Sequence, residues 1–149
     1  MQKQMLTVKY IETEDEYQSA RAIREDVFII GQNVPREIEL DEYEDTATHI
    51  LALDDGHAIG TARWRYTNEG VKLERFAVPE PNRGKGVGVA LVEFALNELR
   101  EEPVIYLNAQ EQVISFYEKL NFEGVKDIFY EADIPHLKMV YRPLDKDKN

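Results

Sequence analysis

The segment from Val71 to Asn108 constrains the fold of this chain more than any other part of the sequence. It consists of an apolar strand pattern over residues 71–78, a glycine-rich turn, apolar residues at helical spacing up to Glu101, and a second strand pattern over residues 104–108. Two strands that are joined by a helix pair in parallel, with a right-handed crossover. The segment therefore predicts a central pair of parallel strands with a helix packed against the sheet.

Strand and turn signals on both sides of this segment predict antiparallel neighbours. Asp55-Gly56 is a hairpin signal, and residues 68–70 mark a second turn. The strands expected around these turns and at the two ends of the chain cover residues 6–11, 49–53, 58–66, 125–130 and 137–141. Thr13 and Glu16 form a capping box for a first helix that ends at Gly31. A further helix is expected over residues 111–120, and a short helical turn with a loop over residues 36–45.

These elements predict an α/β (α+β) fold. It has a mixed, mostly antiparallel, twisted sheet of about six to seven strands with one central parallel pair, and helices cover both faces. The 149 residues predict one domain, residues 1–149, with no room for a separate substrate module.

Composition limits the cellular compartment and the classes of binding partner that we expect for this protein. There is no cysteine, no apolar run of membrane-spanning length and no secretory signal pattern, so we expect a cytoplasmic protein that does not bind membranes. With 29 acidic residues against 18 basic ones, the formal net charge is −11. Such a surface repels nucleic acid and favours a cationic partner such as an amine, although the acidity can also serve solubility alone.

The turn after the central strand is the most informative motif. Gly84, Gly86 and Gly88 let the backbone approach a ligand closely, and Arg83 and Lys85 add positive charge at the start of the following helix. This combination is typical of a pyrophosphate site. The turn is not a nucleotide P-loop, since no Gly-Lys-Ser/Thr ends it, and its glycine spacing does not fit a Rossmann fingerprint. A glycine-rich connection without a ligand is the remaining alternative.

Two motifs in this order resemble the GNAT superfamily of N-acetyltransferases. Arg83-x-x-Gly86-x-Gly88 matches the family's Gln/Arg-x-x-Gly-x-Gly/Ala signature, and Ser115-Phe-Tyr-Glu-Lys-Leu-Asn-Phe122 is similar to its Phe-Tyr-x-Lys-x-Gly-Phe motif. Asn121 replaces a glycine there, and asparagine tolerates the left-handed backbone of such a turn. The resemblance covers essentially the whole chain. Further segments, among them Ile134-Pro-His136, look like the bacterial ElaA-like branch, from which Gly31 departs.

The resemblance implies an acetyl-CoA site. The backbone of Phe76, Ala77 and Val78 would pair with the pantetheine arm, and a backbone N–H there would stabilise the oxyanion that develops on amine attack. The residues that would hold the pyrophosphate are Arg83, Gly84, Lys85, Gly86, Val87, Gly88 and Val89. Asn108 and Gln110 are implied as further cofactor contacts, with helix capping as the alternative for each.

The resemblance also implies catalytic roles. Tyr117 stands where the family has a general acid for the departing thiolate; without the family, its spacing suggests a core residue. Glu74 is a candidate general base on the same strand face as Phe76 unless a bulge intervenes, or else an exposed residue paired with Lys72 or Arg75.

Two further assignments concern the acceptor. The Ile-Pro-His resemblance implies a place for His136 at the acceptor site, as a ligand contact or proton relay, with a structural role as the alternative. The acidic residues Glu37, Glu39, Asp41 and Asp45 either recognise a cationic acceptor or form a solvated surface. No spacing of histidines suggests a metal site, so no metal is expected.

The function that follows is transfer of acetyl from acetyl-CoA to a primary amine by direct attack within a ternary complex. The alternatives are an acyl-CoA-binding sensor without catalysis, and an interaction module that uses only the fold. The acceptor, a small molecule or a peptide amine, stays open, and the family suggests a homodimer. Acceptor specificity within one superfold resides in variable loops.

Overall fold

The computed structural model of the protein describes residues 5–143, and its contacts divide the chain into two compact units. The first unit comprises the described residues up to Arg65 together with Glu74–Arg100. The second comprises Tyr66–Leu73 and the described residues from Glu101 onward. Strands β3 and β4 each contribute residues to both units. The prediction of a single domain over residues 1–149 stays a prediction.

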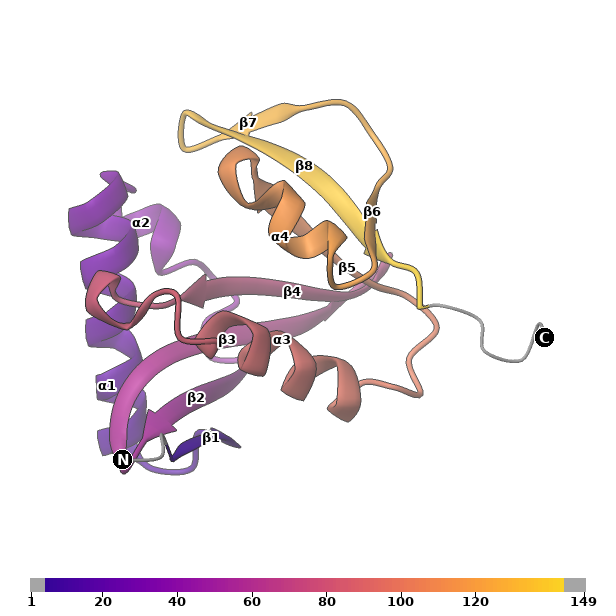
Figure 1. Ribbon diagram of the computed structural model, residues 1–149. Coiled ribbons are helices and arrows are strands. Elements are labelled where there is room, and N and C mark those ends of the chain that lie inside the picture. Colours follow the sequence, from indigo (N-terminus) through magenta and orange to yellow (C-terminus); the bar gives the residue numbers. More distant parts are fainter. Residues whose placement is uncertain (1–4, 144–149) are drawn as a thin grey trace. The chain divides into compact units, whose positions relative to one another are not determined.

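The order of elements along the chain follows the expected one (Figure 1). The strands are β1 Leu6–Tyr10, β2 Thr48–Asp54, β3 His57–Thr67, β4 Gly70–Ala77, β5 Ile105–Gln110, β6 Phe122–Gly124, β7 Phe129–Glu131 and β8 Ile134–Tyr141. The α-helices are α1 Glu14–Arg24, α2 Arg36–Glu39, α3 Val87–Glu98 and α4 Ile114–Glu118. None of the helices within residues 5–143 has the length and apolar character that crossing a membrane requires.

The strands form a mixed sheet in the order β1-β2-β3-β4-β5-β8-β6, with β7 paired to β8. The pair β4–β5 is parallel, with Val71 opposite Ile105, and the neighbouring pairs β1–β2, β2–β3 and β5–β8 are antiparallel. The predicted fold class is therefore confirmed. The sheet has eight strands rather than about six or seven because the chain after Asn121 forms two short strands instead of one over residues 125–130. Both pair with the long β8, β6 through Val140 and β7 through Pro135.

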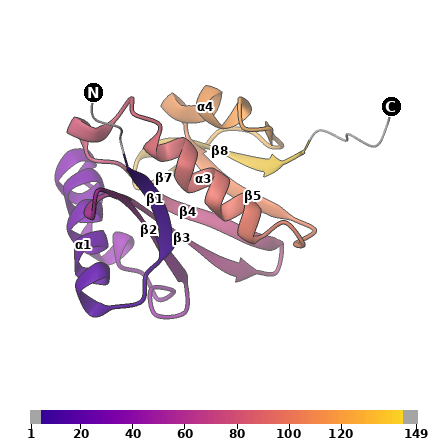
Figure 2. The same cartoon turned by 60° about the horizontal axis from the view of Figure 1, so that its bottom comes forward.

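In the first unit, helices cover both faces of the strands, as strand alternation requires (Figure 2). Leu51 of β2 packs with Ala20, Ile23 and Val27 of the first helical segment. Gly60 of β3, which points to the opposite face, lies against Val87 and Leu91 of α3. The core of this unit therefore lies in two layers, one on each side of the sheet.

The helix that was predicted from Thr13 to Gly31 begins as expected and changes its geometry on the way. The Thr13 hydroxyl accepts from the Glu16 N–H at 3.1 Å, and the Glu16 carboxylate accepts from the Thr13 N–H, so the capping box is present. After Arg24 the chain continues as a π-helical segment, Glu25–Ile30, in which the Gly31 N–H bonds back to the Asp26 carbonyl. This wider turn directly follows the buried Arg24.

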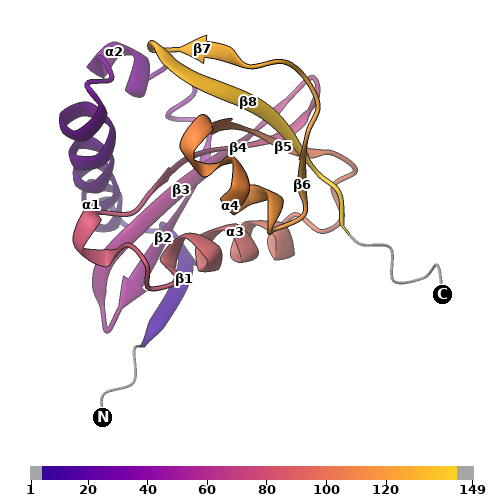
Figure 3. The same ribbon diagram turned by 45° about the horizontal axis from the view of Figure 1, so that its top comes forward.

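In the second unit, the helix that was expected over residues 111–120 is shorter than expected (Figure 3). A 3₁₀ turn over Glu111–Val113 leads into α4, which contacts β5 and β6. Asn121 follows with a φ of 72°, the left-handed backbone that was expected where the family has glycine.

Candidate active site

The glycine-rich turn has the backbone that its sequence predicts. A 3₁₀ turn over Glu80–Asn82 follows Pro79, and Gly84 and Gly86 then take φ values of 80° and 83°. Only glycine adopts such angles without strain. A Cβ at either position would meet nothing within 4 Å, so the turn presents open backbone rather than packed side chains.

Helix α3 begins directly at this turn with its backbone donors available. Gly86 is the N-cap residue and supplies no side-chain cap, and Ala90 donates the first intrahelical bond to the Gly86 carbonyl at 3.0 Å. The N–H groups of Val87, Gly88 and Val89 precede that bond and have no intrahelical acceptor. The first turn also holds no acidic residue, so the positive end of the helix is not neutralised there.

Arg83 is exposed and folds back over the start of the turn. Its Nε donates to the Val78 carbonyl at 2.8 Å. The Val78 carbonyl is thus engaged within the protein. Lys85 is exposed as well, so both cations of the motif lie at the surface of the turn.

Strand β4 is bulged just before the residues expected to meet the cofactor. Arg75 has a φ of 60°, and the alternation of buried and exposed residues breaks at Leu73 and Glu74, which are both buried. A left-handed residue inside a strand is a β-bulge signature. A bulge therefore intervenes between Glu74 and Phe76, and simple alternation no longer relates the two residues.

Glu74 is buried, which contradicts the alternative of an exposed strand residue. Its Oε2 accepts from the Arg63 Nε at 2.6 Å, and both of its oxygens lie 3.3 Å from the Arg65 Nε. Its side chain is 7% exposed. A general base at this position would act from within an ion pair.

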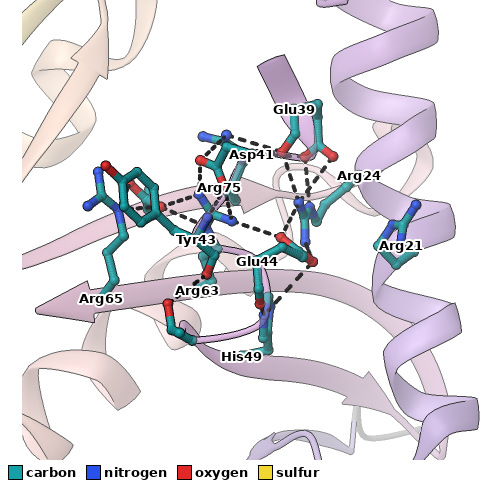
Figure 4. Close-up of polar contacts among 12 residues, drawn as sticks. Arg21, Arg24, Glu39, Asp41, Tyr43, Glu44, His49, Arg63, Arg65 and Arg75 are labelled. Carbon is teal, nitrogen blue, oxygen red and sulfur yellow. Dashed lines mark hydrogen bonds and ion pairs between the residues drawn. The ribbon is translucent and has the colours of Figure 1, made fainter. Parts of the chain in front are cut away.

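Glu74 belongs to a larger cluster, here called the arginine–carboxylate network. Figure 4 shows other residues of this network, among them Arg24, Glu39 and Asp41. The members of the network are Arg24, Arg63, Arg65, Arg75, Glu39, Asp41, Glu44 and Glu74. Four positive and four negative formal charges cancel within it. Tyr43 stacks under the Arg65 guanidinium at 3.8 Å, and His49 lies beside Glu44.

The network corrects the interpretation of the acidic segment. Glu39 is 2% exposed, and its carboxylate accepts a bidentate pair of hydrogen bonds from Arg24, at 2.7 Å from Nε and 3.1 Å from Nη2. Asp41 receives both terminal nitrogens of Arg63, at 3.0 and 2.6 Å. Neither residue is a solvated surface charge, nor is either free to recognise a cationic acceptor. Glu37, by contrast, is exposed.

Two carboxylates of the network, those of Asp41 and Glu44, stay ionised. Burial by itself would raise the pKa of Asp41, but the hydrogen bonds and charge of Arg63 outweigh it, so the pKa lies below its ordinary value. Burial opposes ionisation of Glu44 too, yet hydrogen bonds from Arg24 and Tyr17 lower its pKa to about 2. Asp41 and Glu44 therefore carry fixed negative charges near neutral pH.

Tyr117 lies in the second unit, on α4, and is buried. Its ring makes edge-to-face contacts with Phe116 and Phe122, at centroid distances of 5.0 and 5.7 Å. Burial raises the pKa of the Tyr117 hydroxyl, so the group holds its proton at neutral pH. It is part of an aromatic cluster, as the alternative held, and its hydroxyl is protonated.

The other predicted residues of the second unit lie on β5 and β8. Gln110 is directly opposite His136 in the antiparallel register. The Gln110 side chain does not cap the following turn; its Oε1 accepts from Gln112 at 2.6 Å. The Asn108 side chain contacts Glu131 instead of capping the helix, with its Nδ2 at 3.4 Å from Glu131 Oε1.

His136 is buried and oriented by two contacts. Its Nδ1 lies 2.7 Å from the Ile134 carbonyl, and its ring stacks on Phe129 at 5.8 Å. A carbonyl partner fixes the proton on Nδ1 and leaves Nε2 as the nitrogen that can accept.

The sequence interpretation missed Arg63 and Arg65 of the network. Arg63 and Arg65 alternate with apolar Ala62 and Trp64 on β3, which places both guanidinium groups on one sheet face beside an acid-rich segment. That alternation was the available signal, because a strand with two charges on its inward face needs partners of opposite charge.

Comparison with known proteins gives consistent matches over most of the chain. Residues 13–143 match the family described as Acetyltransferase (GNAT) domain. The Bacillus subtilis protein named Uncharacterized N-acetyltransferase YjcF is 37% identical over 131 residues, which are 85% of this chain and 93% of that protein. Protein ElaA of Escherichia coli is 31% identical over 121 residues, 76% of this chain and 78% of that protein.

A solved structure is similar over a comparable span. The crystal structure of an acyl-CoA N-acyltransferase from Pseudomonas aeruginosa is 26% identical to this chain, with a TM-score of 0.80. The match covers 94% of this chain and 100% of that one.

Proposed function

Because the chain belongs to the GNAT acetyltransferase family, we propose that it transfers the acetyl group of acetyl-CoA to the nitrogen of a primary amine by direct attack. The predicted family, with its similarity to ElaA, is confirmed, and with it the expectation of an enzyme. The observation that carries the proposal is the turn at Gly84 and Gly86, which opens onto the uncapped start of α3. Such a backbone binds a pyrophosphate.

Two segments of the first unit would hold acetyl-CoA. The N–H groups at the start of α3, with Arg83 and Lys85, would bind the pyrophosphate, since they combine dipole and charge. Beyond the bulge at Arg75, the backbone of Phe76, Ala77 and Val78 would pair with the pantetheine arm. Acetyl-CoA supplies an activated thioester, whose carbonyl an N–H of this segment would polarise.

Glu74 of the first unit and the candidate residues of the second unit have proposed roles as well. As the amine nitrogen bonds to the acetyl carbon and the carbon–sulfur bond breaks, the Tyr117 hydroxyl would donate its proton to the leaving sulfur. Glu74 would take the proton lost by the amine, directly or through a water. Asn108 and Gln110 would contact the cofactor, and His136 would contact the acceptor.

One observation keeps a second function open. Glu74 accepts hydrogen bonds from two arginines, so the candidate base is already neutralised. A protein with this arrangement could bind an acyl-CoA without turning it over, as a sensor. Binding without release of thiol in the presence of amines would support that alternative.

The proposal is tested by calorimetry with acetyl-CoA on the wild type and on Gly86→Trp. We expect micromolar binding that the bulky side chain abolishes, because it would fill the open face of the turn. Gly56→Trp is the matched control, since Gly56 has the same left-handed backbone, a φ of 82°, and the same open surroundings in the β2–β3 hairpin. Absence of binding to the wild type at millimolar acetyl-CoA would refute the proposal.

Catalysis is tested separately by release of free thiol with a panel of primary amines. Tyr117→Phe removes only the proposed proton donor, and we expect kcat to fall by about 100-fold or more with little change in acetyl-CoA affinity. An unchanged kcat would remove Tyr117 from the mechanism and leave it as a core residue.

A further inference from the structure

Arg75 combines a strained backbone with an unusually well-held side chain. Among the described residues with positive φ that are not glycine, it alone lies inside a strand; the others occupy turns and loops. A long side chain in the left-handed region costs about 1–3 kcal/mol, and such a conformation persists only where the surroundings enforce it.

The Arg75 guanidinium supplies that enforcement. Its Nη2 donates to the Ile38 carbonyl at 3.1 Å and to the Glu39 carbonyl at 3.2 Å, and it lies 3.2 Å from Asp41 Oδ2. Its Nε lies 3.3 Å from the Glu39 carbonyl and 3.4 Å from Glu39 Oε2. One planar group thus contacts three residues, Ile38, Glu39 and Asp41, at the end of α2.

The partner of Arg75 is itself fixed. Helix α2 has four residues, too few to be stable alone, and Arg75 satisfies carbonyls at its C-terminus. Glu39 is bound to Arg24 of α1, and Asp41 to Arg63 of β3. The segment 38–41 is therefore anchored on two other elements, and it can act as a rigid support for the strand that carries Arg75.

We propose that Arg75 is a positioning residue for the cofactor, whose side chain holds β4 in its bulged form by gripping residues 38–41. The inference rests on the proposed function, in which the next three residues, Phe76 to Val78, present their backbone to the pantetheine arm. Strand side chains and backbone groups alternate with a period of two. Loss of the bulge would shift this alternation by one residue and turn the wrong backbone groups toward the cofactor.

The test uses Arg75→Gly, which allows the left-handed backbone without strain and removes the grip. Two probes separate the halves of the cofactor: acetyl-CoA, and adenosine 3′-phosphate 5′-diphosphate, which carries the pyrophosphate but no pantetheine arm. We expect the Kd of acetyl-CoA to rise by about tenfold, since a small misplacement of a binding group has effects of this size or larger. The Kd of the fragment should change by less than about twofold, because the turn at Gly84 and Gly86 is untouched.

Two further variants sharpen the result. Arg75→Lys keeps the charge but not the planar fork, so we expect it to recover only part of the acetyl-CoA affinity. Asp41→Asn weakens the contact between Arg75 and Asp41 by removing the negative charge, and should raise the Kd of acetyl-CoA as Arg75→Gly does.

The outcomes are distinguishable. Equal acetyl-CoA affinity in the wild type and Arg75→Gly would overturn the positioning role. A parallel loss of both probes would also overturn it, since that result indicates a general structural role. A wild type that binds neither probe would instead refute the proposed function on which the inference rests.

Discussion

Glu44 is the carboxylate through which two buried arginines of the first unit meet. Its oxygens accept from Arg24 Nη1 at 2.7 Å and from Arg63 Nη1 at 2.7 Å, and the Tyr17 hydroxyl donates to it at 2.5 Å. Its side chain is 10% exposed. Removal of one partner from a buried ion pair leaves the other charge uncompensated, and that penalty exceeds the gain from forming the pair.

The lowered pKa of Glu44 predicts an acid-sensitive contribution to stability. Its folded-state pKa of about 2 lies below the ordinary value of 4.5, so the stabilisation is complete above pH 4.5 and disappears as the pH falls toward 2. At pH 7 we expect Glu44→Gln to lower the free energy of unfolding by on the order of 3 kcal/mol. The difference from the wild type should narrow by pH 3, as measured by urea unfolding at both pH values.

Glu37→Gln is the control for this experiment, since Glu37 lies in the same segment and is exposed. Its effect should stay within about 0.5 kcal/mol at either pH. A difference between Glu44→Gln and the wild type that did not depend on pH would show that shape rather than charge is lost.

At the scale of elements, the packing of α3 against β3 decides where the glycine-rich turn lies. Gly60 lies against α3, and a Cβ there would come within 2.7 Å of Val87 Cγ1, 3.2 Å of Leu91 Cδ1 and 3.4 Å of the Ala77 carbonyl. Val87 is the first residue of α3, fully buried and β-branched, so it cannot move aside easily. The absence of a side chain at position 60 therefore determines how closely the first turn of α3 approaches β3.

We expect Gly60→Ala to reduce the free energy of unfolding by about 1–3 kcal/mol, as overpacking of a buried contact does. It should also weaken acetyl-CoA binding, because the first turn of α3 must shift. Gly124→Ala is the matched control: a Cβ there would meet Leu137 Cδ2 at 2.6 Å, the far end of a flexible side chain that can rotate away. Equal losses for the two variants, in denaturant unfolding and calorimetry, would contradict this interpretation.

At the scale of the whole molecule, charge is distributed unevenly. The network combines four arginines with four carboxylates, so the formal net charge of −11 is carried entirely by residues outside it. Surface charges of one sign act at long range on a charged ligand, and salt screens them. The acidic excess can therefore raise the local concentration of a cationic acceptor without contacting it.

This distribution predicts a salt dependence that differs between acceptors. We expect kcat/KM for a dicationic amine to fall as the ionic strength rises from about 0.01 M to about 0.15 M, over which the screening length shrinks from about 30 Å to about 8 Å. An amine that is uncharged at the assay pH serves as the comparison and should change little. Equal responses of both acceptors would show that the acidity acts on solubility rather than on acceptor capture.

The sequence by itself determined the features that depend on local chemistry. The capping box of Thr13 and Glu16, the Asp55-Gly56 hairpin and the parallel pair around Val71 all follow from propensities and spacing over short segments, and all are present. The glycine-rich turn was predictable for the same reason, since positive φ at Gly84 and Gly86 is a property of single residues.

The tertiary structure alone decided which charges meet. Arg24, Glu39, Arg63 and Glu74 come from four different elements, and only folding brings them together. An acidic segment has the same sequence pattern whether it faces water or neutralises buried arginines, because the burial that separates the two cases is set by residues far away in the chain. The left-handed backbone of Arg75 was decided in the same way: its own preferences oppose that conformation, and contacts to Ile38, Glu39 and Asp41 outweigh them.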